Sequence, residues 1–426
     1  MKEDLVSYLW LNQLFNAPLK TEEDEPVTVQ HPGIKNHDAG PDFSNARLKI
    51  GSTIWAGNVE LHVNASDWYQ HNHNTDAAYD NVILHVVVKN DASIYRANGE
   101  KIPTVTIDKQ FDKIIEQRYQ QFMESQFWIA CEGQINKLKP IIIHNWLERM
   151  AIDRLETRTK RIHTYLQETN YDWEQAFFQL LCRSFGFKTN SEPFEMLGKQ
   201  IPLKLIQRNN LSLQQTEALL FGQAGFLEKK IYSQYHEKLR LAYQGIKAKY
   251  SLIPLPEHIW KFMRLRPSNF PTVRLAQMAA LLHQSTHLLR PVLEASSLDK
   301  IKAIYNVKAS DYWITHYHFE KPQTRSVAPK KLGDTAIQLL LINTVIPFLF
   351  VYGKFHNKTE FQDKAIDWLM QLPAERNNIT KKFIKRDFPC NHALHSQALL
   401  QLREHYCRRK KCLDCHIGQH LLSKQD

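Results

Sequence analysis

The sequence predicts an α+β protein in which a sheet-rich N-terminal domain precedes a mostly helical region. Up to about residue 110, apolar and polar residues alternate in short β-branched runs, which is the period of half-buried strands. Beyond that point apolar residues recur at intervals of three and four, as on amphipathic helices. The sign of the net charge changes at the same position. Residues 1–110 contain 9 Lys and Arg and 15 Asp and Glu, whereas the rest of the chain contains 46 Lys and Arg and 29 Asp and Glu.

The expected elements follow in chain order. Residues 1–17 have the apolar spacing of a helix, and 27–29 begin the first strand. Further strands are expected at 46–50, 53–63, 82–88 and 101–107, separated by Gly, Asn and Asp turns. The clearest later helix spans 141–167. The apolar run 336–353 includes Gln338, Asn343 and Pro347, which favours a buried core helix over a membrane span.

These boundaries divide the chain into four expected parts. They are a sheet-rich domain at 1–110, a connecting segment at 111–135, a basic helical domain at 136–375, and a basic C-terminal helical segment with a cysteine cluster at 376–426. A chain of 426 residues is long for one core, so several domains are expected.

The overall net charge of +11 indicates a polyanionic partner, because the region after residue 110 carries a net +17 and the region before it −6. The alternative is that Lys and Arg keep the faces of helices solvated. Six cysteines are too few for a secreted disulfide scaffold, and the N-terminus opens on Lys2, Glu3 and Asp4 with no signal peptide. A cytoplasmic location is therefore expected.

Two carboxylates and an imidazole form the main candidate site. Asp42 lies in Gly-Pro-Asp-Phe, and eighteen residues later Glu60 and His62 alternate with Val59, Leu61 and Val63. In a strand, Glu60 and His62 therefore point to the same face. Such a set can hold a divalent metal, Mg²⁺ or Mn²⁺, with a base beside the attacking water.

The pattern Asp42…Glu60-x-His62 resembles the core of the PD-(D/E)xK nuclease superfamily, with His62 in the place of the motif Lys. The resemblance implies a restriction-endonuclease-like mixed sheet flanked by helices over about the first third of the chain. Over most of its length the chain is also similar to a bacterial family known only as a domain of unknown function, through Gly40-Pro41-Asp42-Phe43, Gly57-Asn58-Val59-Glu60-Leu61-His62, Ser66-Asp67-Trp68, His71-x-His73, Asp76, Tyr79, Asn81 to Val87, Arg266 to Pro271 and the C-terminal cysteines.

Further histidines follow Glu60 and supply ligands for a transition metal. His71, His73 and Asp76 lie in one loop, and His85 lies within an apolar strand. If the strands at 53–63 and 82–88 are neighbours, His85 and His73 join Asp42 and Glu60 around a Mn²⁺, Fe²⁺ or Zn²⁺ ion. The alternative is that His85 is a hydrogen-bonded core residue and the loop histidines are solvent-exposed.

A second metal site is expected at the C-terminus, where Cys407, Cys412 and Cys415 have the spacing C-x₄-C-x₂-C. Zinc is the first expectation and an iron–sulfur cluster the alternative, with Cys390, His392, His395 or His416 available as a fourth ligand. The basic residues between these cysteines are expected to lower the thiol pKa values. By contrast, Cys131 and Cys182 have apolar neighbours and are interpreted as buried core thiols.

Basic residues suited to phosphate contacts occur in two places. One precedes and enters a helix that starts at Pro271, and the other interrupts the cysteine cluster, where residues 376–412 carry a net +8. The candidate nucleic-acid contacts are Arg264, Arg266, Arg274, Arg408, Arg409, Lys410 and Lys411. For the first group, a turn whose arginines pair with nearby carboxylates is the alternative.

The leading hypothesis is a metal-dependent nuclease in which Asp42 and Glu60 bind the metal and His62 orients or deprotonates the attacking water. The basic helical region would hold DNA or RNA. A second hypothesis is a non-catalytic nucleic-acid-binding or assembly protein whose His62 marks a degenerate site. A third is a His/Asp/Glu metallohydrolase that acts on a small substrate.

Overall fold

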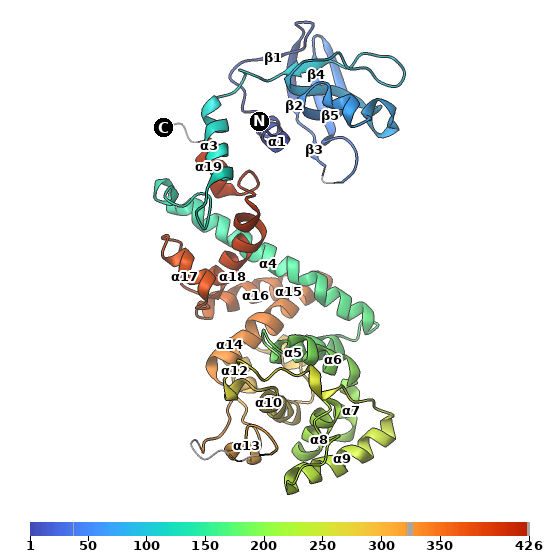
Figure 1. The fold of residues 1–426 in the computed structure, drawn as a ribbon, viewed down its shortest axis with the longest axis vertical. Coiled ribbons are helices and arrows are strands. Elements are labelled where there is room, and N and C mark those ends of the chain that lie inside the picture. The colour runs from blue at the N-terminus through green and yellow to red at the C-terminus, as the bar shows by residue number, and fades with distance from the viewer. Residues whose placement is uncertain (37, 321, 323–326, 424–426) are drawn as a thin grey trace. The chain divides into compact units, whose positions relative to one another are not determined.

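The computed structural model describes residues 1–36, 38–320, 322 and 327–423 (Figure 1). They form two compact units. Unit 1 contains Met1–Trp146, Lys382–Phe388 and the segment from Gln401 onward, and unit 2 contains Leu147–Lys381 and Pro389–Leu400. Unit 1 holds the mixed sheet and unit 2 is helical, which confirms the α+β fold class.

The described residues of unit 1 form a seven-stranded sheet in the order β1-β2-β4-β5-β6-β7, with β3 also paired to β4. Strands β2, β4 and β5 are antiparallel, whereas β5, β6 and β7 are parallel. The strands are β1 (Leu19–Lys20), β2 (Pro26–His31), β3 (Ile34–Lys35), β4 (Phe43–Ile50), β5 (Thr53–Asn64), β6 (Val82–Lys89) and β7 (Thr104–Thr106).

The strands predicted around the candidate site are confirmed, and β5 and β6 agree with their predicted ranges to within one residue. The last predicted strand is shorter than expected. Pro103, which has no N–H to donate, immediately precedes β7, and its carbonyl accepts the N–H of His85 at 2.9 Å.

Helices and turns from both ends of the chain complete unit 1. Helix α1 contacts β5, and the C-terminal helix α19 contacts α3. The elements are α1 (Glu3–Leu11), α2 (Asp67–Gln70), η1 (His73–Thr75), η2 (Ala77–Tyr79), α3 (Lys113–Glu124), η3 (Ile135–Lys137), η7 (Leu402–Tyr406), η8 (Cys407–Arg409) and α19 (His416–Ser423).

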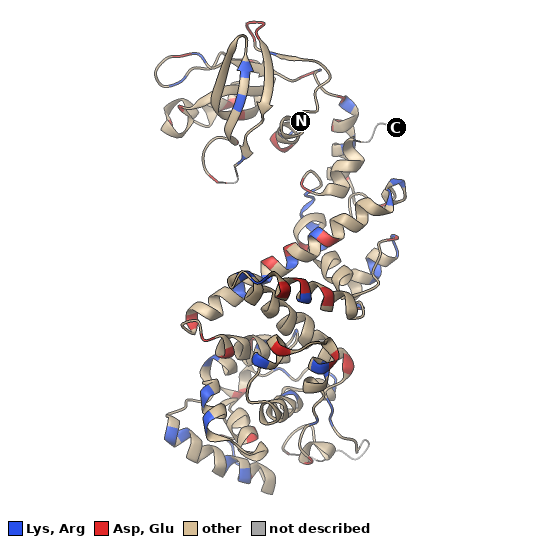
Figure 2. Ribbon diagram, turned by 180° about the vertical axis from the view of Figure 1, so that it is seen from behind, with Lys and Arg blue, Asp and Glu red and all other residues tan. Residues whose placement is uncertain are grey.

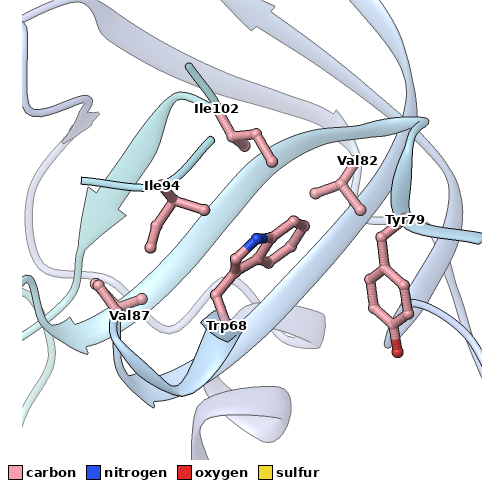
Figure 3. Packing of buried hydrophobic residues seen from close by; sticks show 7 residues of the cluster. Trp68, Tyr79, Val82, Val87, Ile94 and Ile102 are labelled. Atoms are coloured by element: carbon pink, nitrogen blue, oxygen red, sulfur yellow. The ribbon is translucent and has the colours of Figure 1, made fainter. Parts of the chain in front are cut away.

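An apolar cluster holds the loop between β5 and β6 against the sheet (Figure 3). The indole of Trp68, which is fully buried, comes from α2 and packs among Val82, Val87, Ile94 and Ile102. Ala65 and Tyr79 complete the cluster. Because these contacts fix both ends of the loop, the residues between Trp68 and Tyr79 are positioned over the sheet.

Unit 2 consists of helices around a separate apolar core (Figure 1). Helix α4 (Pro140–Glu168) begins in unit 1 and confirms the longest predicted helix. The other helices are α5 (Trp173–Phe185), α6 (Ser191–Gln200), α7 (Leu203–Asn209), α8 (Leu213–Gln223), α9 (Gln234–Tyr250), η4 (Glu257–Ile259), η5 (Pro267–Asn269), α10 (Pro271–Gln284), α11 (Arg290–Glu294), α12 (Leu298–Tyr305), α13 (Tyr312–Thr315), α14 (Asp334–Leu340), η6 (Leu341–Val345), α15 (Ile346–Phe355), α16 (Thr359–Gln371), α17 (Asn378–Ile384) and α18 (Ala393–Gln401). Helices α17 and α18 begin in unit 2 and end in unit 1.

The most apolar helix, Asp334–Phe355, comprises α14, the π-helical turn η6 and α15. By length and composition it is the one described helix that could cross a membrane. However, 78% of its most apolar stretch is buried inside the structure. That burial is typical of a core helix.

Gly57 sets the close approach of β5 to β6. A Cβ at this position would lie 2.5 Å from Cγ2 of Ile83 and 2.7 Å from the carbonyl oxygen of Asn81. We expect Gly57→Ala to lower the free energy of unfolding by about 1–3 kcal/mol, because the backbone oxygen cannot move without disturbing the strand pair. Denaturant unfolding of the full chain measures the change.

The matched control is Gly245→Ala in α9, where a Cβ would meet no atom within 4 Å. Alanine in a helix interior is more favourable than glycine by about 0.5–1 kcal/mol, so this variant should be stabilised. Equal effects of the two substitutions would contradict the packing assigned to Gly57.

Candidate metal centre

The first carboxylate pair is assembled by the antiparallel strands β4 and β5. Asp42 immediately precedes β4, whose first residue pairs with Val59 of β5. The backbone N–H of Asp42 donates to Oε2 of Glu60 at 2.9 Å, and the N–H of Leu61 donates to Oδ2 of Asp42 at 3.1 Å. The two carboxyl groups therefore lie side by side, as the sequence pattern predicts.

The parallel pairing of β5 with β6 brings His62 and His85 next to Glu60. In this register Glu60 lies opposite His85, and His62 lies opposite Val87. Glu60, His62 and His85 share one face, where Nδ1 of His62 and Nε2 of His85 are 2.8 Å apart. His62 and His85 are almost fully buried, with exposed fractions of 1% and 0%.

The loop after β5 brings two further imidazoles over this face. Asn72 has a left-handed backbone (φ 60°, ψ 28°), and this turn separates His71 from His73. Nδ1 of His71 lies 3.1 Å from Nε2 of His62, and Nε2 of His73 lies 3.4 Å from Oε1 of Glu60. The ring of Tyr79 stacks on His73 with a centroid separation of 3.8 Å, which fixes its orientation.

The spacing of these donor atoms fits a single metal ion. Ligand nitrogens of His62, His71 and His73 all lie within 4.8 Å of one another. Oε1 of Glu60 is 3.7 Å from Nε2 of His62 and 3.4 Å from Nε2 of His73. Four ligands at about 2.0–2.1 Å from a tetrahedral ion are about 3.3 Å apart, so the measured separations resemble the edges of a coordination tetrahedron. Three imidazoles and one carboxylate suit Zn²⁺, Fe²⁺ or Mn²⁺ better than Mg²⁺.

Burial raises the pKa values of both carboxyl groups. It raises the pKa of Asp42 to about 6, although the N–H of Leu61 acts against this change. Burial, and next the neighbouring Asp42 carboxylate, raise the pKa of Glu60 to about 9. The pair therefore retains about one proton at neutral pH in the absence of a metal.

Burial lowers the pKa values of three histidines of the site. Burial, followed by repulsion from His73 and His71, lowers the pKa of His62 to about 4. Burial likewise lowers the pKa of His73, and that of His85 falls well below its ordinary value. These imidazoles are consequently neutral at physiological pH, which is the form that binds metals.

His85 lies behind the centre rather than among the donor atoms that face Glu60. If Nε2 of His62 faces a metal, Nδ1 carries the hydrogen and donates to Nε2 of His85. His85 thus holds the tautomer and orientation of His62, as outer residues of metal sites do. Its own Nδ1 is buried without a hydrogen-bond partner among the described residues.

The sequence offers His71 as a possible ligand but leaves it out of the expected metal site, whereas the structure brings its Nδ1 to 3.1 Å from Nε2 of His62. The signal available in the sequence was the His71-x-His73 pair in a loop that returns to the same sheet face. Asp76, in contrast, caps η2 by accepting the N–H of Ala78 at 2.9 Å. The loop therefore contributes imidazoles to the cluster while Asp76 stabilises the turn.

The three arginines of unit 2 that were expected to contact phosphate differ in their exposure to solvent. Arg274 is buried, and its guanidinium donates to Oδ1 of Asn269 at 2.6 Å and to Oε1 of Gln277 at 2.9 Å. It therefore holds the start of α10 instead of facing a phosphate backbone, which corrects the expectation from the sequence. Arg264 and Arg266 are exposed. Figure 2 shows acidic positions interspersed among the basic ones along the helices of this unit.

At the C-terminus, Cys407, Cys412 and Cys415 line one small cavity. Burial raises the pKa of Cys412 to about 12 and of Cys415 to about 11, so the lowering expected from the basic neighbours is overcome by desolvation.

Three of the four basic residues beside these cysteines have partners within the same unit. Nζ of Lys410 donates to the carbonyl oxygen of Met123. Arg408 pairs with Glu404, and Lys411 pairs with Asp414. Both of these ion pairs are exposed and Arg409 is exposed as well, so Arg408, Arg409 and Lys411 remain at the surface.

Comparison with known proteins identifies the family of the chain. The family described as "Protein of unknown function (DUF2851)" matches residues 3–378. The chain belongs to this family. The match includes every residue of the carboxylate and histidine cluster, whereas the three C-terminal cysteines lie beyond it. No curated protein and no solved structure matches the chain, so the nuclease resemblance rests on Asp42 and Glu60-x-His62 alone.

The role of His85 can be tested through metal affinity. We expect His85→Phe to weaken metal binding by about 10–100-fold, because the acceptor for the N–H of His62 is lost. His85→Gln keeps an amide oxygen that can accept this hydrogen bond, and it should retain more of the affinity. Competition titration of Zn²⁺ or Mn²⁺ with a chelating indicator measures both values; equal losses would show that only packing was changed.

Metal binding should also release a proton from Glu60. Its pKa of about 9 means that Glu60 is protonated at pH 7.5, whereas His62, with a pKa of about 4, is already deprotonated. We therefore expect about one proton per metal bound at pH 7.5, and close to none for Glu60→Gln. Calorimetric titrations in two buffers of different ionisation enthalpy count the protons. Unchanged release in Glu60→Gln would assign the proton to another group, and Asp108→Asn, an exposed carboxylate, is the control.

Proposed function

We propose that unit 1 carries a metal-dependent phosphodiesterase centre that acts on nucleic acid. One observation carries the proposal: Oε1 of Glu60 and nitrogens of three histidines converge at separations suited to one ion, beside a second carboxylate. A divalent metal there would stabilise charge on a phosphoryl oxygen and acidify a water molecule. Glu60, His62, His71 and His73 are the residues that would hold it.

In this proposal Asp42, rather than His62, acts as the general base. Both ring nitrogens of His62 already have partners, since Nδ1 contacts His85 and Nε2 faces His71 and Glu60. Its lowered pKa also makes it a poor proton acceptor. Asp42 has a pKa of about 6 and is only partly buried, so it is mostly ionised at neutral pH and basic enough to accept a proton from water. The hydrogen bond from Leu61 holds it beside Glu60.

Nucleic acid is proposed as the substrate because of charge. The chain carries a formal +11, and the basic excess lies entirely after residue 110. Exposed Arg408 and Arg409 belong to the same compact unit as the sheet. Such residues favour contacts with a phosphate backbone without selecting a base sequence.

A small phosphorylated or other hydrolysable substrate is the second candidate. The inward orientation of Arg274 and the interspersed acidic residues of unit 2 favour it, since both reduce the basic surface that a polymer would contact. On this reading, turnover of a small phosphodiester would proceed without any salt-sensitive binding of DNA or RNA. A non-catalytic binding protein would show that salt-sensitive binding with no turnover.

Substitution of the carboxylates tests the proposed chemistry. Glu60→Gln and Asp42→Asn should each lower the cleavage rate of single-stranded DNA, duplex DNA or RNA by at least about 100-fold in the presence of Mn²⁺ or Zn²⁺, because one removes a ligand and the other the base. Nucleic-acid binding should change little. Cleavage is followed on end-labelled substrates.

Asp108→Asn is the matched control, because Asp108 is an exposed carboxylate of the same unit. It should cleave at the wild-type rate. Wild-type rates in both Glu60→Gln and Asp42→Asn would remove the proposed centre. Binding without cleavage by the wild type under all metals would favour the non-catalytic alternative.

A further inference from the structure

Four cysteines, not three, meet at the C-terminal cavity. Cys131 lies between α3 and η3, about 280 residues before the C-terminal cysteines in the chain. It lines the same cavity of about 20 Å³ as Cys407, Cys412 and Cys415. The sequence predicts that Cys131 is a buried core thiol, and the structure adds that it lies beside three other thiols. Six cysteines occur in the whole chain, so two thirds of them gather at one point.

The C-terminal segment is folded so that its three thiols face the same space. Lys410 has a left-handed backbone (φ 51°), which reverses the chain after η8. The N–H of Lys411 then donates to the carbonyl of Tyr406 at 3.0 Å, and that of Cys412 donates to the carbonyl of Lys410 at 2.8 Å. A second tight turn joins the N–H of Cys415 to the carbonyl of Cys412.

Gly418 allows α19 to pack directly against this turn. A Cβ at Gly418 would lie only 2.2 Å from the carbonyl oxygen of Cys412. Cys415 immediately precedes α19, and the N–H groups of Ile417 and Gly418 interact with its sulfur. Amides at the start of a helix stabilise a thiolate. The local backbone is thus arranged to favour the ligating form of this cysteine.

The Cys131 segment is held against the C-terminal segment by contacts around Trp128. The guanidinium of Arg403 lies 4.5 Å from the ring of Trp128 and donates to its carbonyl oxygen at 2.8 Å. Arg386 also lies over this ring and pairs with Glu132 at 2.7 Å. These contacts keep Cys131 at the cavity independently of any ligand.

The indole N–H of Trp146 is buried beside Cys415, and its ring lies next to Tyr406 and His416. This N–H acts on the sulfur of Cys415, and a thiolate at this position would accept it as a hydrogen bond.

We propose that Cys131, Cys407, Cys412 and Cys415 hold a metal centre through four thiolates. The observation that carries the proposal is that all four thiols, from two distant segments, line one cavity. Four cysteine sulfurs are the ligand set of a structural zinc ion and also of an iron–sulfur cluster.

The metal centre would join two parts of unit 1 that are distant in sequence. Cys131 follows α3, whereas the other three ligands lie in the segment that ends with α19. A bond between such distant positions restricts the unfolded chain strongly and resists local opening of the C-terminal segment. The centre is separate from the histidine cluster, so it does not depend on the proposed hydrolytic activity.

The decisive experiment compares iron, acid-labile sulfide and zinc in the full chain purified without oxygen. The variants are Cys131→Ser, Cys412→Ser and, as a matched control outside the cavity, Cys390→Ser. Wild type and Cys390→Ser should contain the thiolate-bound metal, which is zinc without sulfide if one ion is held, or iron with sulfide and broad visible absorption if a cluster is held. Cys131→Ser should lose this metal at least about tenfold, as Cys412→Ser does, because a ligand is removed.

A second readout separates loss of the metal centre from loss of the fold. Cys131→Ser should still bind Zn²⁺ or Mn²⁺ in a Glu60-dependent manner, and limited proteolysis should cut its C-terminal segment faster than in the wild type. Wild-type metal content in Cys131→Ser would overturn the assignment of Cys131. Wild-type metal content in both Cys131→Ser and Cys412→Ser would overturn the thiolate centre.

Discussion

The parallel pairing of β5 with β6 is the interaction on which the candidate site depends. Its register places Glu60 opposite His85 and lets His62 contact His85 at 2.8 Å. A register shift lies between Asn58 and Val59, just before these residues. Side chains alternate along a strand, so a slip of one residue would turn the imidazoles to the apolar face. The close approach at Gly57 and the packing of Trp68 both protect this register.

The site combines carboxyl groups and imidazoles, and burial shifts their pKa values in opposite directions. Desolvation raises the pKa values of Asp42 and Glu60, and it lowers those of His62, His73 and His85. Both changes keep the groups neutral, because burying an uncompensated charge is costly. A divalent cation would reverse the first change without requiring protons on the imidazoles. If a divalent metal bound here, it would therefore add to the stability of the folded site.

The fold class and the main elements around the candidate site could be predicted from the sequence, although α1 and β7 are shorter than predicted. Alternation in 53–63 and the β-branched run at 82–88 identified β5 and β6, and the helical period identified α4. These signals are local, since each arises from which face of one element is buried. The assembly of unit 1 from Met1–Trp146 and the segment from Gln401 is different. It depends on contacts such as Arg403 with Trp128, for which one sequence has no periodic signal.

By itself the sequence determined the identity of the chemical groups, namely Asp42, Glu60-x-His62, the loop histidines and the C-terminal cysteines, and that Glu60 and His62 share a face. Tertiary structure alone decided that His71 joins the donors, that His85 lies behind His62, and that Arg274 turns inward. It also decided that Cys131 meets three cysteines about 280 residues away. The physical reason is that spacing reports geometry within one strand or helix, whereas these contacts depend on strand pairing and on loops that return across long separations.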